Sequence, residues 1–172
     1  MRIEVDNYRF DFPNAIDVYK FDEQASASPH YHGVTALKAV DVMVEMPGEY
    51  LFIEIKTFDD LTDFYKQNKN YNADDAKKWL IRNLSRKYRE TFLYRYCERK
   101  LNKSISYICL LNFDKNLISH CRKALGRAIP VGKGNRLRWH RVLLETDRLF
   151  VVDQAAWNRN LTHWGTCAYV GH

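Results

Sequence analysis

The sequence has no hydrophobic run that approaches the roughly 20 residues needed to span a bilayer. Its first residues, MRIEVDNYRF, also lack the basic, apolar and small-residue order of a signal peptide. We therefore expect a cytoplasmic protein without membrane contacts. No internal repeat or Pro/Ser-rich linker divides the 172 residues, and 46% of them are hydrophobic. These features predict a single domain over residues 1–172 with one buried core.

Several cysteine and nucleotide motifs are also missing. The four cysteines, at 97, 109, 121 and 167, lie too far apart for a CxxC zinc knuckle, and a chain of this length needs no disulfides. We expect reduced and mostly buried thiols. There is no Walker loop, GxGxxG, HExxH or GxSxG motif, so nucleotide-driven motors, Rossmann redox enzymes, zincins and α/β-hydrolases receive no support.

A β-hairpin is predicted over residues 36–57. Its arms, ALKAVDVMVEM and YLFIEIKT, are rich in β-branched and aromatic residues and flank a PGE turn. Side chains alternate between the two faces of a strand. In the second arm this alternation separates Leu51, Ile53 and Ile55 from Phe52, Glu54 and Lys56.

The other predicted elements complete a mixed α/β fold. A helix is expected from Asn72, which suits an N-cap, to about Lys100, with its apolar side chains recurring every four residues. Residues 104–113 read as a central strand that is buried on both faces. Residues 14–20 fit either a strand or a helix. A further helix is predicted over 115–129, and strands over 138–146 and 149–153. This order gives a mixed central β-sheet flanked by helices.

Asp41, Glu54 and Lys56 are charged residues within the apolar hairpin. A hairpin can bring Asp41 and Glu54 onto neighbouring strands, and two convergent carboxylates suit Mg²⁺ or Mn²⁺. Lys56 would project from the same strand face as Glu54, where a cation can orient an attacking water. The alternative is an amphipathic edge hairpin with one wet face, on which these charges pair across strands.

The residues VD at 40–41 and FIEIK at 52–56 resemble the signature of the PD-(D/E)xK nuclease-like superfamily. Val40 stands where the motif has proline. The resemblance implies a restriction-endonuclease-like αβββαβ core spanning about residues 20–146. It also implies that Asp41 and Glu54 bind Mg²⁺ or Mn²⁺, that Lys56 is the catalytic lysine, and that cleavage leaves a 5′-phosphate.

Many members of that superfamily carry a further acidic metal ligand on an N-terminal helix. Asp22 and Glu23 are the only acidic residues between Lys20 and Asp41. Glu23 is preferred because the family usually uses glutamate at this place. A solvated acidic pair beside a polar loop is the alternative.

Basic residues suggest a nucleic-acid partner, which the net charge of +6 allows without requiring it. Lys78, Arg82, Arg86 and Arg89 are spaced to lie on one face of the long helix, where they can contact phosphates or form a solvated surface. Arg136 and Arg138, with Trp139, form a second basic and aromatic group. A Trp139 that faces inward from its strand and belongs to the core is the alternative.

Together with the resemblance, these features predict a Mg²⁺-dependent nuclease, with DNA preferred to RNA as the expected substrate. By analogy, it would serve restriction, repair or antiviral defence, as a homodimer or with a partner protein from the same operon. Two alternatives remain. One is a non-catalytic nucleic-acid-binding or protein-binding subunit of a larger complex. The other is an unrelated α/β domain in which EIK occurs by accident.

Overall fold

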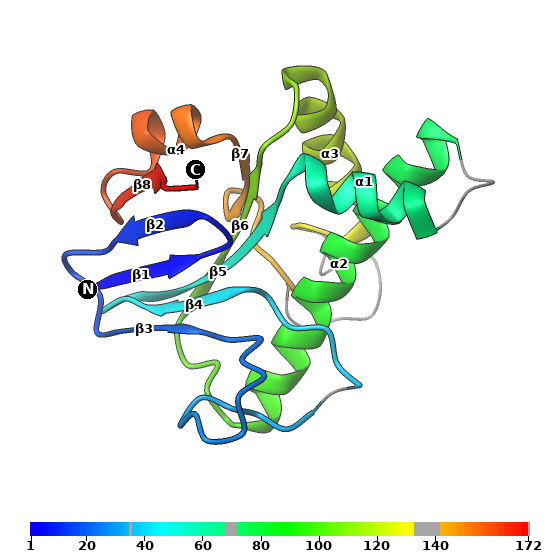
Figure 1. Cartoon of the computed structure of the whole chain (residues 1–172). Coiled ribbons are helices and arrows are strands. Elements are labelled where there is room, and N and C mark those ends of the chain that lie inside the picture. The colour runs from blue at the N-terminus through cyan, green and yellow to red at the C-terminus, as the bar shows by residue number, and fades with distance from the viewer. Residues whose placement is uncertain (35, 68–71, 133–141, 172) are drawn as a thin grey trace.

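The computed structural model describes residues 1–34, 36–67, 72–132 and 142–171. Five strands form a mixed sheet in the order β3-β4-β5-β6-β7, and a smaller sheet has the order β1-β2-β8 (Figure 1). Four helices complete the described part of the chain. The elements are β1 (Arg2–Val5), β2 (Tyr8–Asp11), β3 (Asp17–Lys20), β4 (Val42–Glu45), β5 (Glu49–Lys56), α1 (Phe58–Gln67), α2 (Ala73–Cys97), β6 (Ser104–Leu111), α3 (Lys115–Ala128), β7 (Leu149–Val152), α4 (Gln154–Asn160) and β8 (Thr166–Tyr169).

The predicted hairpin is confirmed as β4 and β5. The two strands pair antiparallel, and Met46 N–H donates to the Glu49 carbonyl across the turn at 2.8 Å. On its other side β5 pairs in parallel with β6, so β5 is the middle strand of the large sheet. The amphipathic edge hairpin is therefore wrong, because both faces of β5 are buried.

Two layers cover the large sheet. On one face Phe52 and Tyr107 pack against Leu80 and Leu84 of α2, and α3 joins the same cluster. On the other face the aliphatic side chains of β5 and β6 pack against the β1-β2-β8 sheet and α4. Figure 1 shows α2 and α3 on one side of the strands and the small sheet with α4 on the other. Phe52, Glu54 and Lys56 thus belong to the α2 side.

Helix α2 begins where the sequence predicts. The Asn72 side chain accepts hydrogen bonds from the backbone N–H groups of Asp74 and Asp75, and the Asp75 side chain accepts one from the Asn72 N–H, which forms a capping box. The expected four-residue repeat of buried apolar side chains runs from Leu80 to Tyr96 and is only partly correct, because Tyr96 is exposed. Each step of four residues turns the helix about 40° past a full turn, so a stripe with that spacing drifts away from the core.

Several boundaries differ from the prediction. Residues 17–20 form a strand, so a helix over 14–20 is wrong. Residues 142–146 are not a strand, and the rest of the predicted 138–146 strand lies outside the described residues. The described residues ahead of β4 contain no helix, so the leading helix of an αβββαβ core is not found there.

The expectation for the cysteines is supported. All four cysteines are free and only Cys97 is exposed, so most thiols are buried as predicted. In the part of the chain that the structure describes, no helix has the length and apolar character to cross a bilayer.

Candidate active site

The hairpin brings Asp41 and Glu54 together. The register pairs Val42 with Ile53, which places Asp41, just before β4, opposite Glu54. Both side chains are buried, and Asp41 Oδ2 accepts a hydrogen bond from the Ile55 N–H at 2.6 Å. The sheet therefore fixes the position of the Asp41 carboxylate relative to Glu54.

Lys56 lies beside Glu54, as the strand alternation predicts. Its Nζ is 3.1 Å from Glu54 Oε1 and 3.2 Å from Asp60 Oδ1. The second oxygen of Asp60 accepts hydrogen bonds from the N–H and hydroxyl of Thr57, which immediately precedes α1. Asp60 thus ties the ammonium of Lys56 to the beginning of α1.

A second lysine, Lys87 of α2, enters the same cluster. Its Nζ lies 2.9 Å from Asp41 Oδ1 and 3.1 Å from Glu54 Oε2. Asp22 Oδ2 is 3.8 Å from the same nitrogen. The two lysines therefore contact different carboxylate oxygens of Glu54, one from its own strand and one from the covering helix.

The electrostatics follow from burial of four charged side chains. Burial, followed by the neighbouring Asp41 carboxylate, raises the pKa of Glu54 to about 8 although both lysines act to lower it. Burial alone would lower the pKa of Lys56 and Lys87, but the surrounding carboxylates raise both above the usual lysine value. Both ammoniums are thus charged at neutral pH.

Negative charge extends beyond the cluster on two sides. Burial and the Asp41 carboxylate raise the pKa of Asp22, which follows β3, and of Asp6, in the turn between β1 and β2. Glu23 is placed differently: its Oε1 accepts a hydrogen bond from the Ala25 N–H in its own loop at 2.9 Å. Asp22, rather than the preferred Glu23, therefore lies beside Asp41.

The donor set suits a hard divalent cation. Mg²⁺ is usually held by one or two protein carboxylates, with water and substrate phosphate as the other ligands. Neither oxygen of Glu54 accepts a well-directed hydrogen bond, although each has an ammonium at 3.1 Å. Among the described residues no group of three or more His, Cys, Asp or Glu side chains is arranged around one ion position. Asp41 and Glu54 are thus the two facing carboxylates that could hold such an ion.

A cavity of about 190 Å³ leads to the cluster from the loop side. Asp22 and Lys87 line it together with Glu23, His32 and Lys38. Its walls are mainly polar, and Lys87 belongs to both the cavity and the carboxylate cluster. The cavity therefore reaches the cluster at Asp22 and Lys87, whereas Asp41 and Glu54 are buried behind them.

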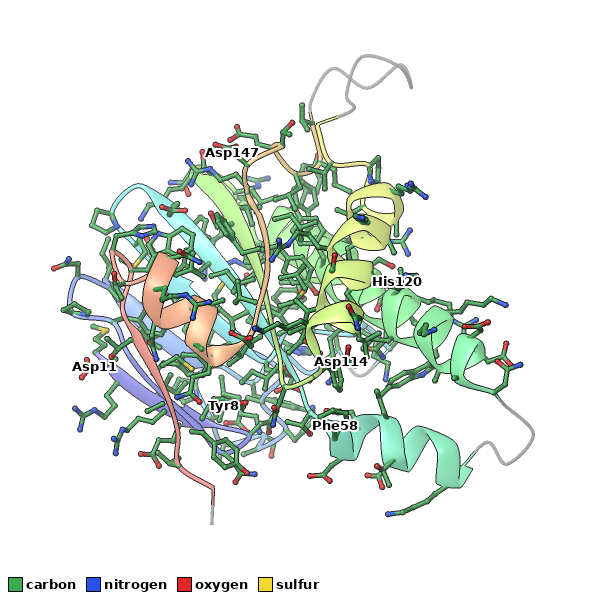
Figure 2. The ribbon with its side chains drawn as sticks, turned by 90° about the horizontal axis from the view of Figure 1, so that it is seen from above. Tyr8, Asp11, Phe58, Asp114, His120 and Asp147 are labelled. Carbon is green, nitrogen blue, oxygen red and sulfur yellow. The ribbon has the colours of Figure 1, made fainter. Side chains whose placement is uncertain are left out.

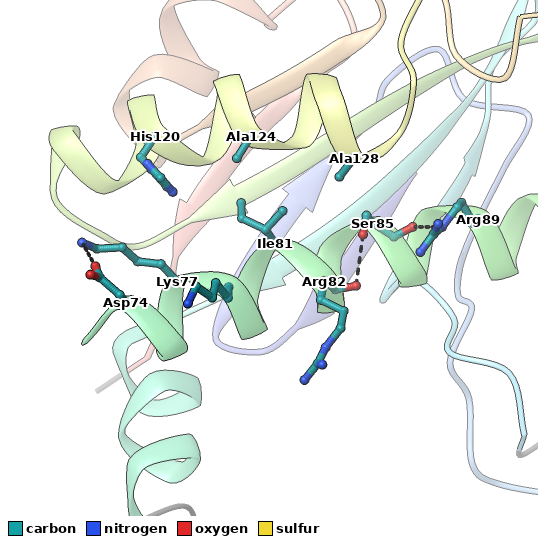
Figure 3. A pocket seen from close by; sticks show the side chains of 10 residues that line it. Asp74, Lys77, Ile81, Arg82, Ser85, Arg89, His120, Ala124 and Ala128 are labelled. Carbon is teal, nitrogen blue, oxygen red and sulfur yellow. Dashed lines mark hydrogen bonds and ion pairs between the residues drawn. The ribbon is translucent and has the colours of Figure 1, made fainter. Parts of the chain in front are cut away.

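The basic residues of α2 lie away from the cluster. Lys78, Arg82 and Arg89 border a groove of about 570 Å³ between α2 and α3, whose floor contains Ile81 and Ala124 (Figure 3). Lys78 precedes Lys87 by nine residues, or two and a half turns, so the two point to opposite sides of α2. Arg86 lies outside this groove and pairs with Glu90. The predicted Arg136 and Arg138 fall outside the described residues.

Lys87 and Asp60 were not predicted as site residues, although the sequence contains a signal for each. Lys87 lies seven residues after Leu80 and thus on the buried face of α2, where a lysine is unusual. Asp60 completes a Thr-x-x-Asp pattern at the start of α1.

The start of α1 lies beside the start of α3. Figure 2 shows Phe58, the first residue of α1, near Asp114, which precedes α3, and Phe58 packs edge-to-face on Phe113.

Comparisons with family models, with curated proteins and with solved structures find no match for this chain.

Proposed function

We propose that this protein is a Mg²⁺- or Mn²⁺-dependent phosphodiesterase that hydrolyses nucleic acid, with DNA favoured over RNA. One observation carries the proposal: Asp41, just before β4, lies opposite Glu54 of the adjacent strand β5, and Lys56 pairs with Glu54 at 3.1 Å. In the PD-(D/E)xK superfamily, whose motif these residues resemble, the corresponding positions hold two metal ligands and a catalytic lysine. The antiparallel β3-β4-β5 order, followed by β6 parallel to β5, supports a core of that type.

Each residue of the cluster has a distinct task in this proposal. Asp41 and Glu54 would hold the divalent ion, and the Ile55 N–H fixes the orientation of Asp41. When bound, that ion would stabilise charge on the scissile phosphate and acidify a water ligand. Lys56 orients the attacking water and offsets negative charge on the phosphate. Asp60 keeps the Lys56 ammonium near Glu54.

The test is cleavage of supercoiled, linear and single-stranded DNA and of RNA, with Mg²⁺, Mn²⁺ or a chelator. Glu54→Gln and Lys56→Met remove one charge each, and we expect the rate to fall by about 10²-fold or more. Glu4→Gln and Lys123→Met alter exposed residues on β1 and α3 and serve as matched controls. Circular dichroism and thermal unfolding verify that each variant folds.

Metal-dependent cleavage that both site variants lose and both controls keep would establish the phosphodiesterase and identify its substrate. The ends of the products should carry 5′-phosphates. Absence of cleavage by the wild type on every substrate would contradict the proposal. If the same proteins then bind nucleic acid with equal affinity, the non-catalytic binding subunit becomes the better description.

A further inference from the structure

Lys87 occupies the place between Asp41 and Glu54 that a shared cation would take. Its Nζ is within 2.9 Å of one carboxylate and 3.1 Å of the other, and its side chain is only 11% exposed. An ammonium and a divalent ion on the same two oxygens would lie about 4 Å apart or closer, where like charges repel strongly in a buried site. The two cations therefore exclude each other.

The charges around the cluster favour a more highly charged cation than an ammonium. Four carboxylates, those of Asp22, Asp41, Glu54 and Asp60, lie within ion-pair distance of the two ammoniums, Lys56 and Lys87. When Glu54 is ionised, these four carboxylates therefore carry two more charges than the two ammoniums neutralise. Because neither Glu54 oxygen accepts a well-directed hydrogen bond, Lys87 satisfies this carboxylate incompletely.

The protein also has room for the displaced ammonium. Lys87 already lines the cavity of about 190 Å³, where Asp22 and Glu23 provide carboxylate oxygens. A lysine ammonium moves on a flexible four-carbon stem. Rotation of that stem can therefore take Nζ from Asp41 and Glu54 towards Asp22 without a change in α2.

We propose that Lys87 is an internal counter-ion for the metal ligands Asp41 and Glu54, and that a divalent cation displaces its ammonium into the adjacent cavity. This inference rests on the proposed function, because it takes Asp41 and Glu54 as the metal ligands. In this role Lys87 is a positioning residue. It keeps the buried carboxylates paired before metal arrives, and it sets how tightly the metal binds.

The first test measures Mn²⁺ binding by the electron paramagnetic resonance of free Mn²⁺. Lys87→Met keeps the length and apolar stem of the side chain and removes the competing charge. We expect Lys87→Met to bind Mn²⁺ about tenfold or more tightly than the wild type. Lys123→Met, on the exposed face of α3, should bind as the wild type does. Thermal unfolding with and without Mn²⁺ checks that Lys87→Met is folded.

The second test follows Lys87 in the wild type by reductive dimethylation and peptide mass spectrometry. Without metal, the buried and paired ammonium should react slowly. With Ca²⁺ or Mg²⁺, and no nucleic acid present, labelling of Lys87 should rise several-fold while labelling of Lys123 stays constant. This readout does not depend on catalytic activity.

The outcomes separate the two proposals. Tighter Mn²⁺ binding by Lys87→Met together with metal-induced labelling of Lys87 supports displacement. If the wild type binds Mn²⁺ while Lys87 stays protected, or Lys87→Met binds no better, displacement is wrong and the metal site stands. If neither protein binds Mn²⁺, displacement and the metal-dependent function both fail.

Discussion

Glu54 shows how a carboxylate can be kept inside a folded protein. Its side chain is completely buried between β-sheet and helix, an environment that penalises a charge unless it is paired. Lys56 and Lys87 approach one oxygen each, yet burial and the Asp41 carboxylate still raise the pKa of Glu54 to about 8. The residue is therefore poised between a neutral and an ionised form near physiological pH.

This raised pKa predicts a specific pH dependence of stability. The unfolded chain releases the Glu54 proton near the ordinary value of 4.5, whereas the folded protein keeps it to about pH 8. Between these values the folded state binds more protons, so the free energy of unfolding falls as pH rises. Glu54→Gln cannot ionise and should lack this contribution. Urea unfolding in metal-free buffer at several pH values should show that the free energy of unfolding falls less steeply with pH in Glu54→Gln than in the wild type.

The expected size of that effect is on the order of a few kcal/mol between about pH 5 and pH 8. Glu4→Gln, on the exposed edge of β1, is the control and should follow the wild type. Parallel pH profiles for the wild type and Glu54→Gln would contradict the assignment of a raised pKa to Glu54.

Asp60 makes a second prediction at the residue scale. Asp60→Asn keeps the shape of the side chain and an oxygen for the Thr57 N–H, but removes the negative charge 3.2 Å from Lys56 Nζ. We expect cleavage at saturating metal to slow by about tenfold, because Lys56 is less firmly positioned. Mn²⁺ affinity should change little, since the ion pair of Asp60 is with Lys56 and not with the proposed ligands. Equal losses in binding and rate would instead make Asp60 part of the metal site.

At the scale of elements, local pattern predicts some features and misses others. The hairpin and β6 follow from alternation and β-rich composition, which depend only on neighbouring residues. The position of β5 in the middle of the sheet depends on its pairing with β6, which lies beyond α2 in the chain. The pairing of β2 with β8 joins the two ends of the chain, and no local pattern encodes such a contact.

Helix α2 illustrates why the site was predicted only in part. Asn72 and the acidic first turn identify its start, and Leu80 and Leu84 identify its buried face. Counting every fourth residue from Leu84 leads to Tyr96, which is exposed, and omits Lys87. The true helical period of about 3.6 residues places Lys87 on the same face as Leu80. The sequence predicts Asp41, Glu54 and Lys56 because the two-residue alternation of a strand does not rotate away from one face as a four-residue step on a helix does.

The capping box of α2 gives a prediction for the whole element. Asn72→Ala removes the acceptor for the N–H groups of Asp74 and Asp75 and should lower the free energy of unfolding by about 1 kcal/mol. Asn72→Ser retains a capping oxygen and should stay close to the wild type. Urea denaturation of the three proteins tests this, and an equal loss in both variants would assign the effect to packing rather than to the cap.

At the scale of the molecule, α2 separates two charged surfaces. Its inner side holds Lys87 in the carboxylate cluster, and its outer side contributes Lys78, Arg82 and Arg89 to the groove with α3. In Figure 3, Arg82 and Arg89 project from α2, whereas Ala124 and Ala128 approach from α3. A nucleic-acid strand bound in this groove would have to pass around α2 before one of its phosphates reached Asp41. If the protein binds nucleic acid as proposed, we therefore expect this groove to contribute to binding and not to cleavage.

This separation predicts that binding and cleavage respond to different substitutions. Arg82→Ala combined with Arg89→Ala should weaken binding of nucleic acid and reduce the slope of log K against log salt by about 0.9 for each phosphate that the protein no longer neutralises. Arg86→Ala is the matched control, because Arg86 lies on the same helix but pairs with Glu90 outside the groove. Fluorescence anisotropy at several salt concentrations measures the slopes.

At saturating substrate the single-turnover cleavage rate of the double variant should stay within about twofold of the wild type, because Asp41, Glu54 and Lys56 are unchanged. A double variant with the wild-type salt slope would show that the α2–α3 groove does not bind phosphates, and the substrate path would then have to run along the cavity beside Lys87 alone.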